Sequence, residues 1–248
     1  MTIPLPFRGD PPDRRDAVLR QSIPFNPAQW RLRLPDPSLW PDELSGDVDG
    51  QTWPSVDREQ VLDIGLRATD PVGATHTYVA AAVWGTGTQA RGVVRRCRPF
   101  VDMSPSDGDP VGTPLAAAVG LLLDRDGGPV AAYDALHGNG QFRVPYIGPA
   151  FGTKVLYFSG FDRVVGRRQP LILDRFVAAA LNHLCGFDWP TTDGGWTTDQ
   201  YAAYLHIAHA WADEWGCRPD VVERVLFSLG RTDPVAVRAL AGAPVTMV

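Results

Sequence analysis

Prolines divide this 248-residue sequence into two parts with different folding possibilities. The first sixty residues contain Pro11, Pro12, Pro24, Pro27, Pro35, Pro37, Pro41 and Pro54. A proline inside a helix removes a backbone hydrogen bond and clashes with the preceding turn. We therefore expect residues 1–60 to form an irregular strap with short helical turns, packed on a core formed by the rest of the chain.

Helical periodicity begins near Asp57, where Val61, Ile64 and Leu66 supply an apolar face. A second apolar stretch, 78–84, ends at glycines. Alternation of valine and isoleucine, which would indicate strands, is nearly absent. The sequence predicts an all-α fold, a helical domain over 61–248 and further helices at 89–97, 115–123, 130–136, 175–184, 198–214 and 219–229.

Composition and apolar runs favour a folded cytoplasmic protein. Hydrophobic residues make up 44% of the chain, enough for a real core. The longest apolar runs, such as 115–123, are far shorter than the ~20 residues of a membrane span, and 1–10 lacks the features of a secretory signal. Three widely separated cysteines fit reduced thiols and support neither a disulfide framework nor a cysteine-bound metal. We expect no membrane partner.

Charge is unevenly distributed along the chain. The formal net charge is −5, but residues 91–175 are net positive between two net acidic segments. A protein that merely coats nucleic acid is not expected to be acidic overall. A local basic face nevertheless remains compatible with binding a polyanion.

The only lysine is Lys154, twenty residues before Asp174. A lysine can lose its proton and attack carbon, whereas an arginine in a protein stays charged. Partial burial near a helix start would lower the pKa of the amine. An ordinary surface lysine in an arginine-rich chain is the alternative. Asp174 directly precedes an apolar helix and is expected to cap it, which does not exclude a catalytic role.

A glycine-rich turn precedes Lys154. We expect a hairpin at 146–158, with short helical segments on both sides of the turn 148–152 and the second segment at 153–158. Unpaired N–H groups at the start of a helix bind phosphate, and Gly148 and Gly152 would permit close approach. Together with Thr153, these residues are predicted to contact DNA.

These motifs resemble the helix-hairpin-helix DNA glycosylases. The matching residues are Phe-Gly-Thr-Lys-Val at 151–155 and Pro-Leu-Ile-Leu-Asp-Arg-Phe-Val at 170–177. The resemblance implies two helical subdomains with a cleft between them, Lys154 as the nucleophile and Asp174 as its partner. The hairpin is two residues longer than is usual in that family.

The segment Val-Leu-Phe-Ser at 225–228 is similar to the closing helix of 8-oxoguanine DNA glycosylase. The resemblance places Glu223 where a glutamine reads the guanine edge, Phe227 where a ring stacks on the base, and Phe158 where a cysteine flanks it. A carboxylate can accept two hydrogen bonds from a guanine-type edge. A solvated surface acid at 223 and core packing of both rings are the alternatives.

The resemblance implies a DNA glycosylase with abasic-site lyase activity that excises an oxidised purine of the 8-oxoguanine type. Its partner would be double-stranded DNA with a damaged base, without a cofactor, and we expect a monomer associated with the nucleoid. The same chemistry on another modified base, for instance in phage defence, and a noncatalytic DNA-binding module remain alternatives.

Two further clusters have competing interpretations. The cluster Arg91, Arg95, Arg96 and Arg98 either contacts DNA or forms a solvated face. The resemblance to 8-oxoguanine DNA glycosylase places Arg91 where that enzyme has an arginine on the unpaired base of the opposite strand. His206, His209 and Asp213 share a helix face with metal-ligand spacing. Because the same helix is amphipathic, we expect packing there and no metal.

Overall fold

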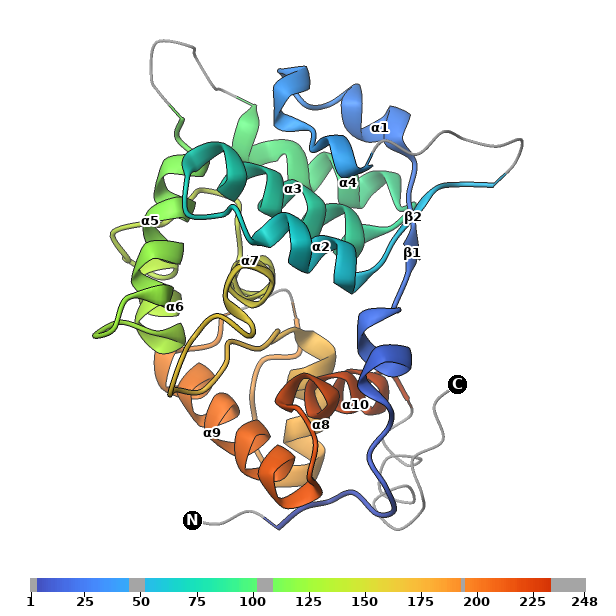
Figure 1. Ribbon diagram of the computed structural model, residues 1–248, viewed down its shortest axis with the longest axis vertical. Coiled ribbons are helices and arrows are strands. Elements are labelled where there is room, and N and C mark those ends of the chain that lie inside the picture. The colour runs from blue at the N-terminus through green and yellow to red at the C-terminus, as the bar shows by residue number, and fades with distance from the viewer. Residues whose placement is uncertain (1–3, 45–51, 102–108, 193–194, 233–248) are drawn as a thin grey trace.

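The computed structural model describes residues 4–44, 52–101, 109–192 and 195–232, which form a predominantly helical protein (Figure 1). The α-helices in these ranges are α1 (Pro27–Arg31), α2 (Arg58–Gly65), α3 (Pro71–Thr86), α4 (Ala90–Cys97), α5 (Gly112–Leu123), α6 (Pro129–Leu136), α7 (Pro149–Gly160), α8 (Arg175–Cys185), α9 (Thr198–Trp215) and α10 (Pro219–Arg231). Shorter turns are a π-helix, η1 (Arg15–Leu19), and the 3-10 helices η2 (Pro37–Leu39), η3 (Asp42–Leu44) and η4 (Arg98–Phe100). Within the described ranges, no helix is long and apolar enough to cross a membrane.

Helix starts follow local capping chemistry. Asp57 and Gln60 form a reciprocal capping box at α2, and Thr197 and Gln200 form another at α9. Asp70 caps α3 by accepting a hydrogen bond from the Gly73 N–H. The helices expected from periodicity are confirmed close to their predicted bounds, because these signals lie within a few residues of each helix end.

The N-terminal segment is irregular, as its prolines predict, but it also contributes to the core. Phe25 and Trp30 are each only 1% exposed. A short antiparallel pair, β1 (Ile23–Pro24) with β2 (Ser55–Val56), joins the middle of this segment to residues near its end. Residues 1–3 and 45–51 of the predicted strap lie outside the described residues, as do 102–108, 193–194 and 233–248 of the predicted helical domain.

The predicted hairpin differs from the observed structure. Residues 137–148 form turns and irregular backbone, and α7 begins at Pro149 with Gly148 as its N-cap. The segment 148–152 is therefore not a turn between two helical segments. The Gly-Pro pair has a different role: proline fits the first helical position because its missing N–H would be unpaired there anyway. Gly152 therefore lies inside α7, and Lys154 lies in its second turn.

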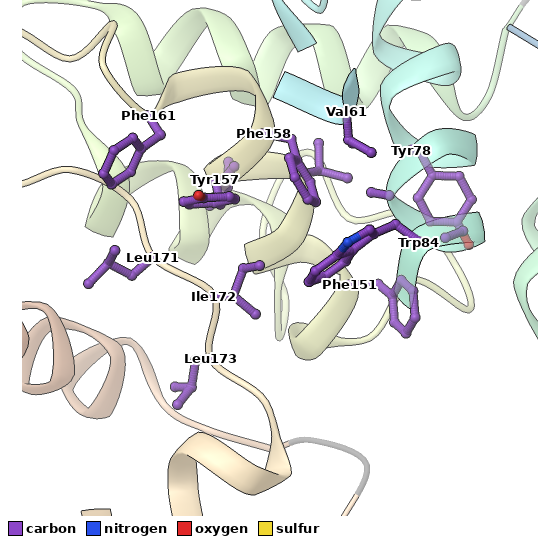
Figure 2. Packing of buried hydrophobic residues seen from close by; sticks show 14 of the residues in the cluster. Val61, Tyr78, Trp84, Phe151, Tyr157, Phe158, Phe161, Leu171, Ile172 and Leu173 are labelled. Carbon is purple, nitrogen blue, oxygen red and sulfur yellow. The ribbon is translucent and has the colours of Figure 1, made fainter. Parts of the chain in front are cut away.

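Helix α7 lies at the centre of the fold. It contacts α2, α3, α5 and α6, while α10 packs on α8 and α9 as a second group, which Figure 1 shows on the other side of α7. All residues of α7 from Phe151 to its end are buried, which is typical of a helix surrounded by neighbours. Figure 2 shows the rings of Phe151, Tyr157 and Phe158 extending from α7 and the ring of Trp84 from α3 beside them.

The position of Gly152 is explained by a close internal neighbour. A Cβ atom added there would overlap the ring atoms Cε1 and Nε2 of His137, at the end of α6. This glycine permits α6 and α7 to approach each other, and it is buried from solvent in α7. The predicted close approach of Gly152 to a DNA phosphate is replaced by close approach to a protein side chain.

Substitution Gly152→Ala is expected to lower the free energy of unfolding by about 1–3 kcal/mol, because a rigid ring must move. Gly120→Ala in α5 is the matched control, since a Cβ there meets nothing within 4 Å. It should raise the free energy of unfolding by up to ~1 kcal/mol through helix propensity. Denaturant unfolding of both variants measures the difference, and equal stabilities would contradict the assigned role of His137.

Candidate active site

Lys154 is buried in α7 with 5% of its surface exposed, so the surface interpretation of this residue is wrong. Its Nζ donates to the carbonyl oxygen of Ala150 at 3.3 Å and lies 3.8 Å from Oδ2 of Asp174. It also lies 5.0 Å from the centre of the Phe151 ring. The structure thus brings the two sequence-predicted catalytic residues together.

The environment lowers the pKa of Lys154 below its ordinary value. Burial is the largest cause, because it disfavours the ammonium form. The carboxylates of Asp174 and Glu223 act in the opposite direction, while the guanidiniums of Arg96 and Arg58 lower the pKa further. The predicted direction of the shift is confirmed, and it increases the fraction of neutral, nucleophilic amine at a given pH.

Asp174 uses its two carboxylate oxygens for different purposes. Oδ1 accepts hydrogen bonds from the backbone N–H groups of Phe176 at 2.9 Å and Val177 at 3.2 Å, capping α8 as expected. Oδ2 is the atom that faces Lys154. Capping and pairing with the amine therefore coexist in one side chain.

The extended segment before Asp174 is fixed at three successive carbonyls. Thr153 Oγ1 donates to Leu173 O at 3.2 Å and accepts from Leu173 N at 3.1 Å. Tyr204 Oη donates to Ile172 O at 2.9 Å, and Tyr201 Oη donates to Leu171 O at 3.2 Å. These bonds hold the start of α8 against α7 and so determine where the Asp174 carboxylate lies.

This geometry places Thr153 in the interior. The residue has no exposed surface, and its hydroxyl is engaged by the backbone of Leu173. From this position it aligns Asp174 with Lys154, in place of the DNA contact expected from the sequence. Gly148 remains at the half-buried N-cap of α7.

Three neighbours of Lys154 were not assigned to the site from the sequence. The guanidinium carbon of Arg96 lies 3.6 Å from the centre of the Phe151 ring. A Cβ on Gly85 would approach Cε of Lys154 to 3.1 Å and the Phe151 ring to 3.2 Å. Phe151, one helical turn before Lys154, was recognisable from spacing, but no local signal indicates that Gly85 faces α7.

Glu223 is not a surface acid, since it is completely buried. Arg58 donates to it from both terminal nitrogens, at 2.6 Å to Oε2 and 3.2 Å to Oε1. The same guanidinium lies over Trp84, 4.8 Å from the ring centre, and its Nε donates to Gln21. Glu223 would have to be uncovered before it could read a base edge, because its side chain has no exposed surface.

The two predicted base-contacting rings occupy different environments. Phe158 is 1% exposed, and its ring meets that of Trp84 edge to face with 5.5 Å between the ring centres. It therefore packs in the core, which was the alternative to a contact with the base. Phe227 is only partly buried and packs edge to face on Phe176 at 5.4 Å. Of these two rings, Phe227 is the one with surface left to contact a ligand.

The remaining candidates are exposed or have other partners. Arg91 and Arg95 are exposed on α4. His206 is within 2.8 Å of a guanidinium nitrogen of Arg168, and His209 is within 3.1 Å of the carbonyl of Gln169. Across the described ranges, no three histidine, cysteine or carboxylate side chains are grouped so as to hold a metal ion.

Helices that surround a buried lysine facing a capping aspartate match the expectation for a DNA glycosylase. Residues 16–227 match the model of the family described as "Putative 8-oxoguanine DNA glycosylase OGG-like protein". The chain belongs to this family, and the resemblance inferred from the sequence is confirmed. No curated protein and no solved structure gave a significant match.

The lowered pKa of Lys154 can be measured directly, because selective labelling of lysine with ¹³C at Cε gives a single side-chain signal. The titration midpoint of the wild type should lie below the ordinary lysine value of about 10.5. Asp174→Asn should move the midpoint further down, since the carboxylate that favours the ammonium is lost. Asparagine still caps a helix, so folding is retained. A midpoint that rises in the variant would contradict the proposed pairing.

Proposed function

We propose that this protein is a DNA glycosylase with abasic-site lyase activity, in which Lys154 is the nucleophile. The observation that carries the proposal is the burial of the only lysine beside Asp174, with its pKa lowered. A lysine that only bound phosphate would gain from being exposed and charged. Burial disfavours the charged ammonium, and the neutral amine that results is suited to covalent chemistry.

The reaction begins when the damaged nucleotide is flipped out of the duplex, because C1′ is inaccessible inside the base stack. The neutral amine of Lys154 attacks C1′, and the glycosidic bond breaks with its electron pair leaving on the base, which takes up a proton. The Asp174 carboxylate stabilises the positive charge that develops on the sugar. Oδ2 lies 3.8 Å from Nζ, so a shift of about 1 Å would bring it within the distance at which it can receive a proton from the attacking amine.

The lyase step follows from the covalent bond. Opening of the sugar ring converts the bond between C1′ and O4′ into a hydroxyl and leaves a protonated Schiff base between C1′ and Nζ of Lys154. Loss of a proton from C2′ then expels the 3′ phosphate. Hydrolysis of the Schiff base returns the free amine, so no external oxidant or reductant is needed.

We propose an oxidised purine of the 8-oxoguanine type as substrate, which the family description supports. The roles of Glu223 and Phe227 in recognising it remain predictions. A modified base without the guanine donor pattern is a second candidate substrate. The observation that favours it is the engagement of both Glu223 oxygens by Arg58.

Borohydride trapping tests the proposed nucleophile. Wild-type protein with duplexes containing 8-oxoguanine, other modified bases or an abasic site should give a covalent adduct, and peptide mapping should place it on Lys154. Lys154→Gln should abolish the adduct. An adduct that persists in this variant would implicate the amine of Met1, and cleavage of another modified base without cleavage of any 8-oxoguanine duplex would select the second substrate.

Glu223→Gln separates stabilisation from base reading. If the carboxylate serves Arg58, the variant should lose about 3–5 kcal/mol of unfolding free energy, as expected for a broken buried ion pair. The exposed Glu214→Gln is the matched control and should change stability by less than ~0.5 kcal/mol. For the Glu223→Gln protein that remains soluble, the ratios of single-turnover rates on different modified bases should equal those of the wild type. A changed ratio would assign Glu223 to base recognition.

A further inference from the structure

Tyr146 combines exposure with an uncommon backbone conformation. It lies in the loop between α6 and α7, its φ angle is +68°, and 55% of its surface is exposed. Only Asp162 shares a positive φ among the other non-glycine residues of the described ranges. Side chains are disfavoured in this region, and such conformations gather at functional sites.

Buried residues hold the loop in place on both sides of this tyrosine. Val144 is 3% exposed and Ile147 is 7% exposed, and both pack into the hydrophobic core. Ile147 also donates its backbone N–H to the carbonyl of Val144 at 3.2 Å. The loop is therefore fixed, and the Tyr146 ring is presented to solvent from a rigid support.

An arginine lies beside this ring, and the same loop carries a second arginine. The guanidinium carbon of Arg98 is 4.3 Å from the ring centre, and both Arg98 and Arg143 are exposed. The two segments that meet here, 91–98 and 137–149, contain five arginines and no acidic residue, in a chain with a net charge of −5. Their local charge is opposite to that of the whole protein and suits a polyanion.

This basic and aromatic surface adjoins the candidate active site. Arg96, two residues before Arg98, stacks on Phe151, and the Nζ of Lys154 lies near the same ring. The loop itself leads directly into α7 through Gly148. The Tyr146 loop therefore joins Arg98 to the start of the helix that carries Lys154.

We propose that Tyr146, Arg98 and Arg143 form a DNA contact beside the active site. In this contact the Tyr146 ring stacks on a base neighbouring the flipped nucleotide, and the two guanidiniums bind backbone phosphates. The proposal rests on the proposed function, because it takes duplex DNA as the ligand. Every base offers a flat face, so an aromatic ring in this place supports flipping without adding sequence preference.

The test uses variants that keep the backbone conformation. Tyr146→Asn removes the ring, and asparagine tolerates a positive φ better than most residues, so the fold is preserved. Tyr146→Phe retains the stacking face. Trp53→Ala, an exposed aromatic residue elsewhere, is the control for losing a surface ring.

Binding is measured by fluorescence anisotropy in a Lys154→Gln background, on a duplex with 8-oxoguanine and on one with an abasic site. Tyr146→Asn should weaken binding about 5- to 150-fold, the range for loss of one base stack. Tyr146→Phe and Trp53→Ala should bind like the parent. Arg98→Gln should weaken binding and reduce the slope of log affinity against log salt by roughly one phosphate contact.

The outcomes separate this interface from the proposed function. If the wild type forms the borohydride adduct and Tyr146→Asn binds as tightly as Trp53→Ala, the interface is overturned and the function stands. An unchanged slope of log affinity against log salt in Arg98→Gln would show that Arg98 makes no phosphate contact. Absence of both DNA binding and adduct in the wild type would overturn the interface and the proposed function together.

Discussion

The arrangement of the candidate active site depends on the pair of hydrogen bonds between Thr153 Oγ1 and the backbone of Leu173. They join the central helix α7 to the segment that ends in Asp174, and Tyr201 and Tyr204 hold that segment from α9. Because the Asp174 side chain also caps α8, the carboxylate has little freedom to turn away. The distance between Lys154 and Asp174 is thus set by hydrogen bonds that hold the backbone before Asp174 in place.

Burial of charge gives the site its chemistry. Two carboxylates, Asp174 and Glu223, and two guanidiniums, Arg58 and Arg96, act on the Lys154 amine in opposite directions, and burial remains the largest influence on its pKa. The buried pair of Arg58 with Glu223 connects α2 to α10. Such a pair is costly to desolvate and strongly destabilising to break. It therefore links the stability of the fold to the electrostatic surroundings of the proposed nucleophile.

Most helices were predictable because their signals are local. Apolar spacing and capping residues such as Asp57 act within one or two turns, so the pattern alone identified their positions. The start of α7 was not predictable in this way, because Gly148-Pro149 is compatible either with a turn or with an N-cap followed by the first helical residue. For Glu223 the sequence offered base reading or a surface acid and missed the pairing with Arg58, because that partner lies 165 positions away along the chain. A contact of that separation leaves no periodic trace in the sequence.

The sequence by itself determined the helical fold class, the single lysine available for covalent chemistry and its pairing with Asp174, because these depend on residue type, local periodicity and the motif shared with a known family. Tertiary structure decided the burial of Lys154, the internal roles of Thr153 and Gly152, and the association of Glu223 with Arg58. The physical reason is that desolvation and close packing arise only when distant segments meet. The chemistry of a residue can be read from its side chain, but its pKa and its neighbours belong to the folded protein.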